Sequence, residues 1–192
     1  MATTTTGPTT QATRTTRALT WGLFAAWLVH DLEEVATMRA DTRRVLAGVP
    51  AAVPLPGGWR EGGLPQRHVE VAVALMGGVV AAAAVHGHRT GGRSGPYQSA
   101  LLAFGLHGFG HVALSLAARR YTTGVVTSPT VVIPFWLWAR HRLREAGVTS
   151  TASPGAVAAT VPLLWTTHAL AYLLTRRSRG RRGDLSVPSG RV

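Results

Sequence analysis

Five apolar stretches constrain this chain more than any other feature of its sequence. Each is close to the ~20 residues that a helix needs to cross the hydrocarbon core of a bilayer, and none shows the period of two expected of barrel strands. Pro129 and Pro134 should kink the fourth. The stretches run over residues 18–38, 68–88, 97–118, 121–139 and 155–175. The sequence therefore predicts an all-α fold, a polytopic transmembrane helix bundle with about five spans.

Polar tails flank this single predicted domain. Residues 1–16 are rich in threonine and almost free of apolar side chains, so we expect a disordered tail. Residues 17–175 form the single transmembrane helical domain. Residues 176–192 form a basic tail that we also expect to be disordered. Inside the domain, the Pro- and Gly-rich stretch 39–67 is expected to form a loop.

The charge of the chain points to lipid rather than to nucleic acid. The formal net charge is +12, and all 20 basic residues are arginine. These arginines flank the apolar stretches, so anionic headgroups and topology explain them, and we expect the bilayer and no nucleic acid as a partner. The exclusive use of arginine suggests a bacterial chain, which predicts a multi-pass protein of the inner (cell) membrane. The side richer in arginine should be cytoplasmic, which places the C-terminus inside; the arginines of residues 140–144 oppose this orientation.

The first apolar stretch ends in an unusual polar cluster, His30-Asp31-Leu32-Glu33-Glu34. On a helix, His30, Glu33 and Glu34 occupy positions i, i+3 and i+4 and share one face. An ionisable residue inside a span is costly unless it is paired, ligated or facing a wet cavity. This cluster therefore requires a specific partner.

Other spans supply matching groups at a common depth. The third span carries His107 and His111 at i and i+4, a spacing that lets two imidazoles reach one ion. The fifth carries His168, and the oppositely running second span begins with His68 and Glu70. All these groups lie towards the same leaflet, which favours a single site. The candidate metal ligands are His30, Glu33, Glu34, His107, His111, His168 and Glu70.

The chemistry of this set fits a divalent metal ion. The chain has no cysteine, so any metal must use histidines, carboxylates or backbone oxygens, and this donor set suits Zn, Fe or Mn. Such an ion would activate water or polarise a substrate oxygen. Glu33 and Glu34 are the candidate catalytic residues, since a carboxylate that does not bind the ion can act as a base.

Three functions follow from this reading. The first is a metal-dependent membrane hydrolase or oxidoreductase that acts on a lipophilic small molecule. The second is a proton or ion relay or a transporter, and the third is a structural or assembly protein whose polar cluster is a hydrogen-bonded network. The sequence leaves the metal, the substrate and the oligomeric state open.

The motifs resemble those of the bacterial HxxEE membrane-protein family. That family has the His-x-x-Glu-Glu sequence in a first span, then a later His and then a Tyr-x-Pro-Gly motif. The later His corresponds here to His107 or His111, and the order and spacing favour His111. Here the last motif is Tyr121-Thr122-Thr123-Gly124, with Thr123 at the position of the proline. The resemblance covers roughly residues 19–134. It implies a membrane protein with a metal site and names no reaction.

Overall fold

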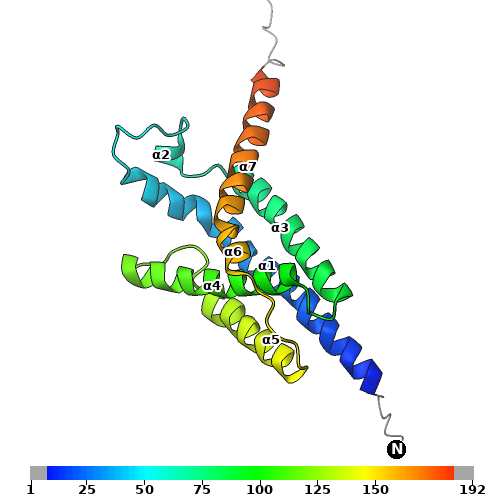
Figure 1. The fold of residues 1–192 in the computed structure, drawn as a ribbon. Helices are drawn as coiled ribbons and strands as arrows, with labels where there is room; N and C mark the ends of the chain where they lie inside the picture. The colour runs from blue at the N-terminus through cyan, green and yellow to red at the C-terminus, as the bar shows by residue number, and fades with distance from the viewer. Residues whose placement is uncertain (1–7, 184–192) are drawn as a thin grey trace, which may run out of the picture.

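The computed structural model describes residues 8–183, with side chains from residue 16 to residue 176, and this part of the chain is entirely helical (Figure 1). An all-α fold is thereby confirmed. The elements in chain order are α1 (Pro8–Ala47), α2 (Trp59–Gly62), α3 (Gln66–Arg89), α4 (Gly95–Ala118), the π-helix η1 (Ser128–Val132), α5 (Ile133–Glu145), α6 (Pro154–Ala158) and α7 (Thr160–Gly183).

Three helical stretches are long and apolar enough to cross a membrane. They are Gln66–Arg89, Gly95–Ala118 and Pro154–Arg176, and they coincide with the second, third and fifth predicted spans. The described part of the chain therefore has the helices of a membrane protein. The first predicted span lies within α1, which is long enough to cross a membrane but, because of its acidic cluster, is not apolar enough over a whole span. The fourth predicted span begins with a non-helical turn, and its α-helix, α5, has only 13 residues.

Helix α1 is much longer than the apolar stretch from which it was predicted. It has 40 residues, which corresponds to about 60 Å. Residues 8–16, expected to be disordered, are helical, and so are residues 39–47, expected to belong to a loop. The reason is the absence of a strong helix breaker between Pro8 and the Gly48 to Pro50 segment, so that the helix propagates from its apolar centre in both directions.

The C-terminal tail differs from expectation in the same way. Helix α7 continues to Gly183, so residues 176–183 extend the last apolar helix instead of leaving it. The remaining parts of the two predicted tails, residues 1–7 and 184–192, lie outside the described residues.

The fourth apolar stretch, in which the sequence predicts a kink, changes from a π-helix to an α-helix near its two prolines. After α4 the chain makes a turn through residues 119–127, then forms η1, with Pro129 near its start. It continues as α5, with Pro134 in the first turn. A proline removes one backbone donor and pushes the preceding turn apart, which is a common cause of a π-helical segment at a kink.

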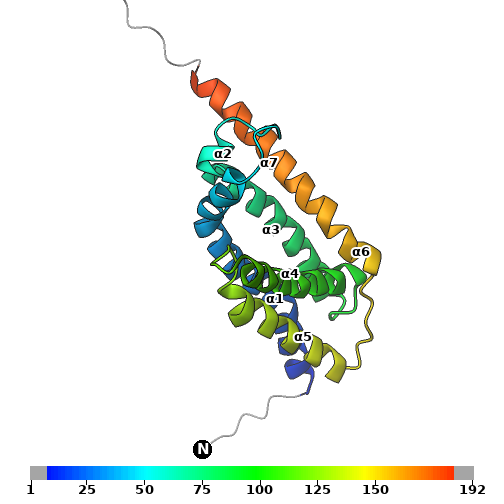
Figure 2. The same ribbon diagram turned by 90° about the vertical axis from the view of Figure 1, so that its left-hand side faces the viewer.

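The helices pack around α1. Helices α1 and α3 run antiparallel along one another, α4 crosses them, and α7 lies against α3 (Figures 1 and 2). A hydrophobic core joins α1, α4 and α5, and in it the buried Tyr97 hydroxyl donates a hydrogen bond of 2.8 Å to the Leu19 carbonyl oxygen. The residues of this core include Leu19, Leu23, Trp27, Tyr97, Leu101, Phe104, Val132 and Ala139.

Two glycines let η1 and α5 approach α4 closely. A Cβ atom added to Gly105 would collide with the Trp136 ring, and one added to Gly108 would lie 2.8 Å from Val132 Cγ1. Small residues at such positions permit close helix packing in membranes. Because Gly105 and Gly108 flank His107, this packing also fixes the rotation of α4 about its own axis.

Candidate metal centre

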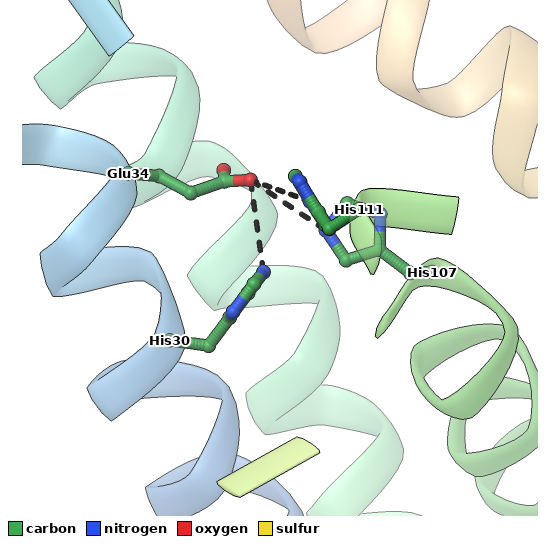
Figure 3. A group of neighbouring side chains, drawn as sticks. All are labelled: His30, Glu34, His107 and His111. Carbon is green, nitrogen blue, oxygen red and sulfur yellow. Dashed lines mark hydrogen bonds and ion pairs between the residues drawn. The ribbon is translucent and has the colours of Figure 1, made fainter. Parts of the chain in front are cut away.

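Four of the predicted ligands meet where α1 and α4 cross. His30 and Glu34 come from α1, and His107 and His111 come from α4 (Figure 3). One potential ligand atom from each of the four lies within 4.8 Å of the other three. The spacing i, i+4 on both helices brings each pair to one face, as the sequence predicts. We call this set the four-residue cluster.

Glu34 occupies the middle of the four-residue cluster. Its Oε1 atom lies 3.0 Å from His111 Nε2 and 3.6 Å from both His30 Nε2 and His107 Nε2. The two histidines of α4 also approach each other, with 2.8 Å between their Nε2 atoms. His30 and Glu34 are buried, whereas 44% of the His107 side chain is exposed. One carboxylate oxygen therefore faces three imidazole nitrogens, and one of the imidazoles is open to the outside.

A hydrogen-bonded chain sets the protonation of His30. The Thr127 hydroxyl donates to Glu33 Oε2 over 2.6 Å, because a carboxylate can only accept. The hydroxyl oxygen lies 2.7 Å from His30 Nδ1 and, having donated its own proton, accepts from that nitrogen. A neutral His30 is therefore protonated on Nδ1, and its Nε2 lone pair is directed at the four-residue cluster. This is the arrangement that orients metal-binding histidines.

The electrostatics at His30 call for a positive charge. Its Nε2 atom is buried and has no hydrogen-bond partner among the described residues, and the Glu34 oxygen that it faces also carries only lone pairs when ionised. Two such acceptors 3.6 Å apart repel each other unless a cation lies between them. A metal ion or a shared proton meets this requirement, and a divalent ion can be coordinated by all four side chains.

Glu33 has a different role from its neighbour Glu34. Its Oε1 atom accepts from the Tyr121 hydroxyl at 2.6 Å and from the Val126 amide at 3.1 Å. Its Oε2 atom accepts from the amide and the hydroxyl of Thr127. Both oxygens are thus occupied in holding the turn after α4 against α1, so the structure places the predicted ligand and base Glu33 beside the four-residue cluster and not within it.

Sequence reasoning did not identify the rest of this attachment. Asp41, two helical turns after Glu33, accepts a hydrogen bond from the Thr123 amide at 3.3 Å and forms an ion pair with Arg120. The only sequence pattern that marks it is the i, i+8 spacing of the two acids on α1. Burial and the hydrogen bond to Glu33 raise the pKa of the Tyr121 phenol above its ordinary value.

Gly124 closes the site from the side of the turn. Its φ of +77° lies in the left-handed region that favours glycine. A Cβ atom at this position would lie 2.7 Å from His111 Nδ1 and 2.9 Å from His30 Cε1. The glycine of the Tyr-x-x-Gly motif is therefore required both by its backbone conformation and by the two imidazole rings that it touches.

The structure places the other predicted ligands elsewhere. His168 Nδ1 lies 3.0 Å from His68 Nε2, with the two rings stacked, and Trp59 meets His68 edge-on at 5.2 Å between centroids. Glu70 is exposed. Among the described residues, the group of potential ligands at the crossing of α1 and α4 includes neither His168 nor Glu70. The common depth of these residues is not matched by a common direction, because His168 faces α3.

One of three comparisons with known proteins found a match, and it covers the region of the chain that contains this site. No curated protein and no solved structure matches the sequence. A family model described as "protein of unknown function with HXXEE motif" matches residues 21–139, more than half of the chain. This range contains the four-residue cluster, Glu33 and the turn that carries Gly124, and it ends before α7 and His168. The protein therefore belongs to the HXXEE family, as the resemblance of its motifs implied.

Proposed function

We propose that the four-residue cluster binds one divalent metal ion, either Zn, Fe or Mn, inside a multi-pass membrane protein. Histidine nitrogens together with a carboxylate form a donor set that suits these ions. Helix bundles build such sites from side chains on facing helices. When bound, the ion would supply Lewis-acid chemistry to an oxygen of a substrate or of water.

The observation that carries this proposal is the direction of the His30 lone pair. The chain from Glu33 through Thr127 holds the Nδ1 proton of His30. The buried Nε2 atom is thereby left as an acceptor that faces the Glu34 carboxylate. A network built only to join helices would instead set a donor against this acceptor.

A lipophilic small molecule is the substrate class that the surroundings favour. His107 is exposed on α4, and its neighbours Leu106 and Phe109 are 50% and 45% exposed. A ligand of the ion that lies on the apolar outer face of a candidate span is reached from the bilayer more easily than from water. The reaction that we propose is hydrolysis or oxidation–reduction, for which the four-residue cluster would hold the ion.

Metal analysis of the purified protein tests the binding of an ion. We expect about one equivalent of metal per chain in the wild type and its loss in His111→Ala. The matched control is His168→Ala, which removes an imidazole that lies outside the four-residue cluster. Equal metal content in the wild type and in His111→Ala would refute the proposal. Loss of metal in both variants would contradict the assignment of the ion to the crossing of α1 and α4.

A hydrogen-bonded network is the second candidate, and the contact between His107 and His111 favours it. Their Nε2 atoms lie 2.8 Å apart, so one ring can donate to the other without an ion. In that case a shared proton would satisfy Glu34, and the protein would serve as a relay or as an assembly factor. Purified protein that contains no metal, and takes up none on titration, would establish this alternative.

We propose further that the protein crosses a bacterial inner membrane about five times, with its C-terminus in the cytoplasm. The side chain of Gln98 at the start of α4 donates a hydrogen bond of 3.1 Å to the Thr149 carbonyl oxygen after α5. The segment of η1 and α5 therefore returns along α4, which supports a fourth crossing. Likewise, α1 runs antiparallel to α3, which supports a first.

Cysteine labelling tests this topology directly, because the chain has no native cysteine. In a five-span protein, Gly57→Cys lies in the cytoplasm and Ser150→Cys on the opposite side. If only the three most apolar helices cross, both positions lie on the same side. Labelling of both from one side of intact cells would therefore refute five spans. Labelling of Gly57→Cys alone from outside would reverse the orientation.

A further inference from the structure

A second site lies at the opposite end of α4 from the four-residue cluster. A cavity of about 430 Å³ opens between the first turns of α4, the end of α5 and the segment that follows α5. His107 lies nine positions after Gln98, which lines the cavity, and this corresponds to about 14 Å along the helix. This cavity, which we call the arginine pocket, is distinct from the proposed metal centre.

The arginine pocket is lined by apolar side chains on its buried side and by basic side chains at its exposed rim. Leu101, Leu143 and Val148 form its buried side. Arg140 and Arg144, both exposed, lie one helical turn apart on α5 and also line it. A volume of this size is typical of pockets for small ligands, and the combination of an apolar floor with a cationic rim suits an amphiphile with an anionic head.

Among the residues described with side chains, neither rim arginine is neutralised by an acid. The only acid nearby in sequence, Glu145, binds Arg142 at 2.9 Å and His141 at 3.2 Å. Among residues 16–176, no carboxylate forms an ion pair with Arg140 or Arg144. The Arg140 guanidinium lies over the Trp136 ring, 5.0 Å from its centroid, so its described partner is an aromatic ring and not an acid. Two arginines that lack an acidic partner among the described residues therefore line the same pocket.

The segment between α5 and α6 forms one wall of the pocket and is hydrogen-bonded to α4. It passes beside the start of α4 (Figure 2) and is attached by side chains of that helix. Gln98 accepts from the Thr151 amide at 2.8 Å, and Ser99 Oγ accepts from the Ser153 amide at 3.1 Å. Because Gln98 is buried and bonded at both ends of its amide, the wall that includes Val148 is fixed.

We infer that the arginine pocket binds the headgroup phosphate of an anionic phospholipid, with the start of an acyl chain on its apolar floor. The position supports this occupant, since the pocket lies at the end of a candidate span, where headgroups are found. Basic pockets between transmembrane helices are a recurring mode of lipid recognition. An arginine is also suited to hold a phosphate by two parallel hydrogen bonds.

The test compares lipids on the full-length protein in neutral detergent, with binding followed by native mass spectrometry. Phosphatidylglycerol is titrated against phosphatidylcholine and, separately, inorganic phosphate. The double variant Arg140→Gln/Arg144→Gln should bind phosphatidylglycerol roughly 30-fold more weakly than the wild type, which is about 1 kcal/mol for each arginine. The matched control is Arg142→Gln, which removes an arginine that already has an acidic partner and does not line the pocket.

Each outcome decides the matter. A preference for phosphatidylglycerol that is lost in the double variant and kept in Arg142→Gln supports the site. Equal losses in the two variants would reveal a general effect of surface charge and overturn it. Binding of inorganic phosphate as tight as that of phosphatidylglycerol would identify a soluble anion as the ligand instead of a lipid, and would overturn the inference. The melting temperature in phosphatidylcholine, measured first, reports whether the double variant is folded.

A second variant keeps the inference testable if the double variant does not fold. Ala152→Trp fills the pocket and leaves both arginines in place, and it should also weaken phosphatidylglycerol binding. Unchanged binding in that variant would overturn the pocket as the site. None of these measurements depends on a metal ion, so the lipid site and the metal centre stand or fall separately.

Discussion

Replacing Gly124 with alanine should damage the metal centre more than any other single methyl group added to the turn. Two costs arise at this position. The backbone has a φ of +77°, and holding an alanine there costs roughly 1–2 kcal/mol. The new Cβ atom would also lie 2.7 Å and 2.8 Å from two atoms of the His111 ring and 2.9 Å from His30, well inside normal contact, and overpacking of this kind costs about 1–3 kcal/mol.

A matched control separates these two costs. Gly58 has a φ of +78°, and no atom of the described residues lies within 4 Å of the Cβ position that an alanine would add there. Gly58→Ala should therefore show the backbone cost alone. In a protein of this size, 1 kcal/mol changes the melting temperature by about 2–4 °C, so Gly124→Ala should melt roughly 2–12 °C below Gly58→Ala. Thermal unfolding followed by the fluorescence of the six tryptophans measures this difference.

Metal affinity gives the second part of the result. Because the rings of His30 and His111 must move to admit the methyl group, we expect Gly124→Ala to bind its ion about 10–100-fold more weakly, and Gly58→Ala to bind it as the wild type does. Equal melting temperatures and equal metal affinities in the two variants would refute the reasoning, because they would mean that the turn does not press on the imidazoles.

Three further predictions concern the attachment of the turn to α1. Glu33→Gln leaves the Tyr121, Val126 and Thr127 donors with a weaker acceptor, so the unfolding free energy should fall by about 2 kcal/mol and metal affinity should fall about 10-fold in a metal titration. Asp41→Asn breaks the ion pair with the partly exposed Arg120 and should lower the unfolding free energy by only about 1 kcal/mol, as measured by thermal unfolding. The pKa of Tyr121 is raised, so its neutral phenol donates to Glu33 fully below the ordinary phenol pKa of about 10. This hydrogen bond is lost as pH rises through the raised pKa. An absorbance titration of the wild type against Tyr121→Phe should place the ionisation of Tyr121 above about pH 10.

The sequence predicted the two halves of the four-residue cluster for a simple physical reason. Side chains four residues apart on a helix point the same way, so the pairs His30 with Glu34 and His107 with His111 are set by local geometry. The meeting of the two pairs also follows from the cost of leaving such groups unpaired in an apolar helix. The change of helix type near the prolines of the fourth stretch rests on equally local chemistry.

The other parts of the site depend on contacts that are distant in sequence. Depth along a helix placed His168 near Glu34, but depth does not specify rotation about the helix axis, and α7 turns His168 towards His68. Thr127 contacts His30 and Glu33, and Asp41 contacts Thr123, because the turn after α4 folds back on α1. Local sequence patterns do not predict that long-range contact. The length of α1 was missed because hydropathy marks where a helix is apolar and not where its backbone stops.

All four donors of the proposed centre come from just two helices, so its geometry depends on the number of residues that precede each donor within its helix. Inserting a single residue into α4 between Phe104 and His107 would rotate both of its imidazoles by about 100° around the axis, away from Glu34 and together. An insertion into the exposed loop before Trp59 would leave all four in place. Natural variation in chain length should therefore accumulate outside the crossing, while the spacing from Tyr97 to His111 stays constant.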